Sequence, residues 1–150
     1  MSQNDPKTIE LYGYGIQREG EASATIKPGM LVERNAGNIR PHDDAGNPAN
    51  PTFAVEMGMV GMSIDDEYEA DDQVIFKTYA AGSGVYAIIA DGQDVSEDDL
   101  LTSNGDGRLK VAGDDDNIVA QALEAANTEG AATEARCRVE VFMTGIKSTA

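Results

Sequence analysis

The sequence predicts a mainly β protein, a small β-barrel or β-tulip-like domain of short strands with an extended N-terminal arm. Short runs alternate between apolar and polar residues, clusters of Gly, Pro, Asn and Asp separate them, and good helix formers gather in one segment only. A length of 150 residues fits one domain. We therefore divide the chain into a flexible N-terminal arm, residues 1–23, and a single β-rich domain, residues 24–150.

The first half of the domain predicts strands set apart by turns. Pro28-Gly29 forms a tight turn that leads into a strand ending near Arg34, and residues 35–38 form a hairpin turn. Residues 43–51 are a loop rich in Pro, Asn, Gly and Asp. Residues 53–62 then alternate as a half-buried strand should, with methionines that we interpret as core filler.

The second half predicts further strand pairs. Residues 73–79 and 85–90 are two β-rich runs that form a hairpin around Gly82-Ser83-Gly84. A second pair flanks residues 104–107, with residues 108–112 as its second arm. The strongest alternation in the chain is at the end, where Cys137, Val139, Val141 and Met143 share one face.

Residues 117–126 fit either a helix or a strand. They contain good helix formers, and the acids before them could cap a helix. A length of about ten residues does not decide between the two. The β character of the surrounding segments favours a strand.

A turn pattern occurs three times. Residues 26–32, 68–74 and 95–101 each begin with an apolar residue, make a turn, and reach another apolar residue six positions later. The uneven spacing of the three occurrences favours a compact barrel of short strands over a solenoid, which needs a fixed period.

The charge is strongly acidic, with 27 Asp and Glu against 11 Lys and Arg and a formal net charge of -16. Nucleic-acid binding is disfavoured, since it needs clustered cations, and binding to an anionic membrane is disfavoured for the same reason. The acids indicate either a negative binding face or the general surface of a protein from a very salty environment. Because they are spread along the whole chain, we prefer the second interpretation.

No motif for catalysis emerges, so we predict no enzyme, no cofactor and no metal ligand. The one histidine, His42, could pair with Asp43 as a base, but we interpret it as a solvated loop residue. Cys137, the one cysteine, is expected to be a small core residue. Calcium could bind at residues 104–107 or 114–116, yet neither has calcium-loop spacing, and solvated turns are the preferred interpretation. The glycines at 82–84 and 58–61 lack the lysine of a phosphate loop.

The order of elements resembles the head decoration (cement) proteins of tailed viruses, the lambda-type decoration protein family. The resemblance spans about residues 24–145 and depends on three features of the sequence. These are the turn and strand at 26–33, the turn at 104–109, and the late pair made by 118–126 and 138–142. In that family the late pair forms two strands that close the barrel. The dense acids are similar to those of salt-loving archaea and indicate a haloarchaeal virus.

The resemblance implies a homotrimer on the outer capsid surface that clamps subunits of the major capsid protein of the same virus, with the N-terminal arm as a docking element. Two alternatives stay open. One is another virion component, such as a turret or tail protein. The other is a small halophilic enzyme with a calcium or carboxylate site at Asp106 and residues 114–116.

Overall fold

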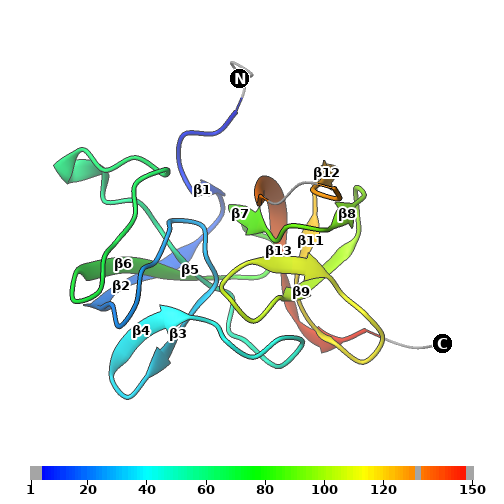
Figure 1. Ribbon diagram of the computed structural model, residues 1–150, viewed down its shortest axis with the longest axis horizontal. Helices are drawn as coiled ribbons and strands as arrows, with labels where there is room; N and C mark the ends of the chain where they lie inside the picture. Colours follow the sequence, from blue (N-terminus) through cyan, green and yellow to red (C-terminus); the bar gives the residue numbers. More distant parts are fainter. Residues whose placement is uncertain (1–4, 131–132, 148–150) are drawn as a thin grey trace.

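The fold is mainly β, as the sequence predicts (Figure 1). The computed structural model describes residues 5–130 and 133–147, apart from the side chains of residues 143 and 144. Its elements are β1 (Glu10–Tyr12), β2 (Gly15–Glu21), β3 (Val32–Asn35), β4 (Asn38–Pro41), β5 (Thr52–Ala54), the 3₁₀ helix η1 (Gly58–Val60), β6 (Gln73–Tyr79), β7 (Gly84–Ile89), β8 (Asp94–Val95), β9 (Leu100–Ser103), β10 (Leu109–Val111), β11 (Asn117–Ala122), β12 (Ala126–Asn127) and β13 (Ala135–Ile146).

A closed barrel forms one half of the molecule. The strands follow the order β7-β10-β9-β11-β13, and β13 pairs with β7 to complete the ring. Within it, β9 and β10 form the expected pair around residues 104–107. Residues 117–122 form a strand, not a helix, and β11 pairs with both β9 and β13. Closing the ring gives each of these strands a neighbour on both sides, although β13 pairs with β7 only from Ala135 to Glu140.

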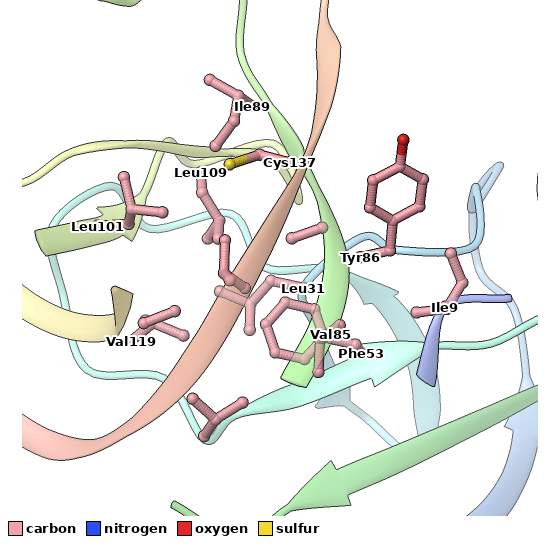
Figure 2. Close-up of a cluster of buried hydrophobic side chains, with 14 of the residues drawn as sticks. Ile9, Leu31, Phe53, Val85, Tyr86, Ile89, Leu101, Leu109, Val119 and Cys137 are labelled. Carbon is pink, nitrogen blue, oxygen red and sulfur yellow. The ribbon is translucent and has the colours of Figure 1, made fainter. Parts of the chain in front are cut away.

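The barrel core is filled by apolar side chains from the alternating faces of its strands (Figure 2). Cys137, Val139 and Val141 of β13 are fully or almost fully buried, which confirms that they share an inward face. The side chain of Met143 lies outside the described residues. Leu31 and Phe53 enter the same core from outside the barrel strands and attach the second half of the molecule to it.

That second half is a three-stranded sheet, β2-β6-β5, next to the β3-β4 hairpin (Figure 1). The hairpin turns at Ala36 and Gly37, both with left-handed backbones, as the sequence predicts. A second core between sheet and hairpin contains Val32, Ile39 and Phe76. The two halves therefore have separate cores, connected through β5 and β6.

The predicted arm is folded from Ile9 onward. Ile9 is fully buried, β1 pairs with β7, and β2 pairs along its whole length with β6. Two glycines make this close pairing possible. A Cβ at Gly15 would lie 2.8 Å from the Tyr79 ring, and one at Gly20 would lie 2.7 Å from Ile39. Residues 1–4 of the arm lie outside the described residues.

Two strand predictions were wrong. Residues 73–79 and 85–90 do not form a hairpin, because β6 pairs with β2 and β5 while β7 pairs within the barrel. Residues 53–62 form a strand only as far as Ala54, after which the chain leaves the sheet and turns through η1. Met59 is 100% exposed and is therefore not core filler. In both cases pairing with sequence-distant strands overrides the local pattern.

The turn pattern predicted at 26–32, 68–74 and 95–101 is one recurring structure, and it occurs a fourth time at 112–118. The first and seventh residues are buried in all four occurrences. The fourth residue has a left-handed backbone, with φ of 97° at Gly29, 76° at Asp71, 75° at Asp98 and 68° at Asp115. Asp and Gly are among the residues that tolerate this conformation best.

In three of these turns the fifth residue is an aspartate that closes the turn. The carboxylates of Asp72, Asp99 and Asp116 accept hydrogen bonds from the backbone N–H of the second residue at 2.8, 2.9 and 2.8 Å. Asp66 accepts in the same way from Ser63 N–H, at 2.8 Å. The acid runs in the sequence therefore include turn-forming residues, a role that neither interpretation of the negative charge included.

Candidate functional site

His42 is a buried structural residue, not the solvated one that we expected. It is 2% exposed, and its Nδ1 lies 2.7 Å from Ser103 Oγ of β9. Its Nε2 lies 3.1 Å from the carbonyl oxygen of Pro48, which can only accept a hydrogen bond, so Nε2 carries the hydrogen. Nδ1 is then free to accept from Ser103, whose oxygen accepts in turn from Gly105 N–H at 3.1 Å. The imidazole thus connects the end of β4, the following loop and the barrel.

Ser103 Oγ and His42 Nδ1 are as close as the atoms of a catalytic dyad, but the pair resembles a dyad in no other respect. Ser103 is fully buried and is not among the residues that line the neighbouring cavity, so a substrate could not reach its oxygen. An acid does lie nearby, with Glu33 Oε1 at 3.8 Å from Nε2, but Arg40 holds the other oxygen of that carboxylate at 2.8 Å. The arrangement fits a hydrogen-bonded anchor between the two halves of the fold.

The candidate calcium residues are all used in turns. The Asp106 carboxylate accepts from Arg108 Nε at 2.9 Å and from Asn104 Nδ2 at 3.2 Å. Burial raises the pKa of Asp106, but these hydrogen bonds outweigh burial and hold the pKa below its ordinary value. Asp116 closes its own turn, and Asp114 and Asp115 are exposed. Within residues 5–130 and 133–147, no three His, Cys, Asp or Glu side chains are placed to hold a metal ion.

Cys137 is a core residue, as the sequence predicts. It is fully buried on β13, and burial raises the pKa of its thiol to about 12. A reactive cysteine needs the opposite, a lowered pKa and access to solvent. The thiol is therefore not a candidate nucleophile.

The glycine-separated Tyr12 and Tyr14 could pack against a partner, an interpretation that we ranked below that of an ordinary strand, and both belong to a set of exposed apolar side chains. Tyr12, Tyr14 and Ile16 are 47%, 65% and 49% exposed, and in the η1 loop Met59 and Val60 are 100% and 72% exposed. The alternating tyrosines were visible in the sequence, but nothing there distinguished an outward face from an inward one. Exposed aromatic and methionine side chains are typical of protein contact surfaces.

Tyr14 is held in a fixed position by the loop that connects β6 and β7. Its backbone N–H donates to Ser83 Oγ at 3.1 Å, and its carbonyl accepts from Ala80 N–H at 2.9 Å. Gly13 allows the contact, because its φ is 100° and an added Cβ would lie 2.4 Å from Ser83 Oγ. The exposed Tyr14 ring is thus presented from an ordered backbone, which lowers the entropic cost of a contact.

Two cavities lie on opposite faces of β2. The first has a volume of about 550 Å³, and its lining includes Arg18, Arg34 and Phe76. The second has a volume of about 340 Å³, and its lining includes Gln17 and Lys77. Because side chains alternate along a strand, Arg18 faces the first cavity and Gln17 the second.

Comparison with known proteins finds similarity in fold. No protein-family model matches the sequence, and no curated protein sequence matches it significantly. A solved structure, the head fiber gp8.5 N base in bacteriophage phi29, is similar with a TM-score of 0.56 and 12% sequence identity. The similarity covers 85% of this chain and 94% of that one. None of the helices within the described residues is long and apolar enough to cross a membrane.

Proposed function

We propose that this chain is a virion structural protein that binds the outside of an assembled viral capsid. The observation that carries the proposal is the fold, which matches nearly the whole of a phage head fiber base. The exposed apolar residues of β1, β2 and the η1 loop supply a contact surface.

In its specific form, the chain is a decoration protein that clamps neighbouring subunits of the major capsid protein. Such a protein binds the assembled shell but not free subunits, so it stabilises the shell by mass action. A homotrimer would combine several weak contacts into one strong attachment. The lambda-type family and the haloarchaeal source belong to this specific form and stay predictions.

The test is binding of the purified chain to expanded, undecorated capsids of the virus that encodes it. The chain and capsids are mixed in high salt, and the bound chain is measured by co-sedimentation. We expect saturable binding and capsids that withstand a higher temperature. Capsids that already carry the chain are the control and should bind no more. An absence of binding to undecorated capsids would contradict the proposal.

A second candidate is the base of a surface projection, favoured because the similar structure is itself described as the N base of a head fiber. A base would carry additional polypeptide outward from the shell, whereas a decoration protein would lie flat between capsid subunits. A reconstruction of the virus particle separates the two by showing whether density continues beyond this domain.

A further inference from the structure

Among the described residues, the edge of β2 that faces away from β6 is unpaired from Gly15 to Glu19. In the sheet order β2-β6-β5, β2 is seven residues long and pairs with β6 on one side. On its other side β4 covers only the C-terminal end, where Ala22 forms a bridge with Ile39 and Ser23 N–H donates to the Ile39 carbonyl at 2.9 Å. In the closed ring each barrel strand has a neighbour on both sides. Proteins usually protect a long exposed edge, because its N–H and C=O groups are ready to pair with another chain.

The alternation of hydrogen bonds along β2 shows which of its backbone N–H and C=O groups point away from β6. At its two ends, Ala80 N–H donates to Tyr14 and Ala22 N–H donates to Asp72, so the even-numbered residues of β2 direct their backbone groups toward β6. The groups of Gly15, Gln17 and Glu19 then point away from β6. None of these three has a backbone hydrogen bond on the outward side among the described residues.

The side chains along this edge distinguish its two faces. Ile16 and Arg18 are exposed on the face of the larger cavity, where Arg34 adds a second cation. The larger cavity also contains Glu33, which is paired with Arg40. Gln17 and Glu19 are on the opposite face, where Glu10, Glu56 and Lys77 line the smaller cavity and Lys77 pairs with Glu10. No acidic residue occurs between Glu10 and Glu19, although the chain has a net charge of -16. One face therefore favours an acidic occupant and the other a basic one.

We propose that an extended segment of another protein adds to β2 as a fourth strand. Its backbone pairs with Gly15, Gln17 and Glu19, and its side chains alternate between the two cavities. On the added strand, an apolar residue lies beside Ile16, an acidic residue beside Arg18 and a basic residue beside Glu19. Opposite charges on neighbouring strands stabilise such pairs, and the backbone ladder supplies affinity.

A second copy of this chain fits the edge less well. Antiparallel pairing of all three outward residues with their counterparts would set Ile16 opposite Arg18 and Gly15 opposite Glu19. Neither pair is favourable, and the contact would bring together two chains of charge -16 each. The inference does not depend on the proposed function, because any protein with such a segment could supply the strand.

The test uses the full chain and a synthetic peptide, Lys-Asp-Thr-Val-Thr, which in antiparallel pairing places Lys beside Glu19, Asp beside Arg18 and Val beside Ile16, and which ends before the part of the edge that Ile39 covers. Amide signals are followed by NMR while the peptide is titrated to about 1 mM, a concentration suited to weak binding. We expect the largest shifts at Gly15, Gln17 and Glu19. A control peptide with Lys and Asp exchanged should bind about 2- to 5-fold more weakly.

Two variants test the geometry. Gln17→Pro removes an outward N–H and no bond to β6, so the fold should survive while peptide binding falls at least tenfold. Gln17→Ala keeps the N–H and should bind within about twofold of the native chain.

Three results would overturn the inference: unshifted amides with the first peptide, equal binding of Gln17→Pro and Gln17→Ala, or a free chain that is oligomeric and becomes monomeric on Gln17→Pro. The last result would show that a second copy covers this edge.

Discussion

The turn aspartates provide a direct test of why this chain is so acidic. In a variant with Asp72, Asp99 and Asp116 all changed to Ala, three backbone N–H groups lose the carboxylates that lie 2.8 to 2.9 Å away. Comparable side-chain caps at helix N-termini contribute about 0.5–2 kcal/mol each. Since these turns are partly or fully exposed, we take the lower part of that range, about 0.5–1 kcal/mol per turn.

The three turns lie in separate parts of the fold, so their effects should add. The expected loss is about 1.5–3 kcal/mol, which corresponds to a fall in Tm of about 3–12 °C for a chain of this size. Urea unfolding at fixed salt measures it, and the slope with urea should not change, since the surface exposed on unfolding is the same. Asn at the three positions retains an acceptor oxygen and should lose less than half as much.

The matched control is the triple variant Glu67→Ala, Glu97→Ala and Asp114→Ala. It removes the same charge from exposed side chains for which the structure shows no hydrogen bond. It should unfold within about 0.5 kcal/mol of the native chain. Equal losses in the two triple variants, or no loss in either, would show that the turn carboxylates do not stabilise the fold.

Three further predictions concern buried positions. Gly29→Ala should lose more than about 2 kcal/mol of stability, because at a φ of 97° its Cβ would lie 2.8 Å from the backbone oxygen of Tyr86, which cannot move aside as a flexible side chain could. Gly37→Ala meets nothing within 4 Å and should lose about 1 kcal/mol, and urea unfolding compares the two variants. Ser103→Ala should lose about 1–3 kcal/mol in the same assay, because it leaves a buried imidazole nitrogen without its donor. Burial raises the pKa of Cys137 to about 12, because the folded chain favours the neutral thiol over the thiolate. The contribution of the neutral thiol to folding stability is therefore complete below about pH 9 and is lost as the pH rises toward 12. Cys137→Ala should weaken this alkaline loss, and a thiol reagent at neutral pH should label the native chain only as fast as it unfolds.

The sequence predicted correctly those parts of the fold that depend on residues close together in the chain. The hairpin turn at Ala36-Gly37 and the alternation around Cys137 and Val139 were both confirmed. Three of the four recurring turns were also found from the spacing of their apolar residues. The fourth was missed because it begins with Ala112, a residue too small to stand out as a core position, although it is only 2% exposed.

The errors share another cause, which is pairing between segments far apart in the sequence. Nothing near Gly82 indicates that β7 pairs with β13, about fifty residues later, and so the local pattern favoured a hairpin. His42 becomes buried only because Ser103 of β9 and the loop before β5 meet around it. Likewise Met59 fitted an alternating strand, and its full exposure follows from where β5 ends.

The two halves of the molecule differ in what they can contribute to binding. The strands of the closed barrel have neighbours on both sides, so most of their backbone groups are already paired. The β2-β6-β5 sheet keeps an open edge, flanked by Tyr14 and Ile16 on an otherwise acidic chain. Acidic turns oppose nonspecific association elsewhere, since like charges repel. The proposed binding role would use the open side of the molecule, and we therefore expect substitutions of the exposed side chains of Ile16, Gln17 and Arg18 to affect binding more than stability.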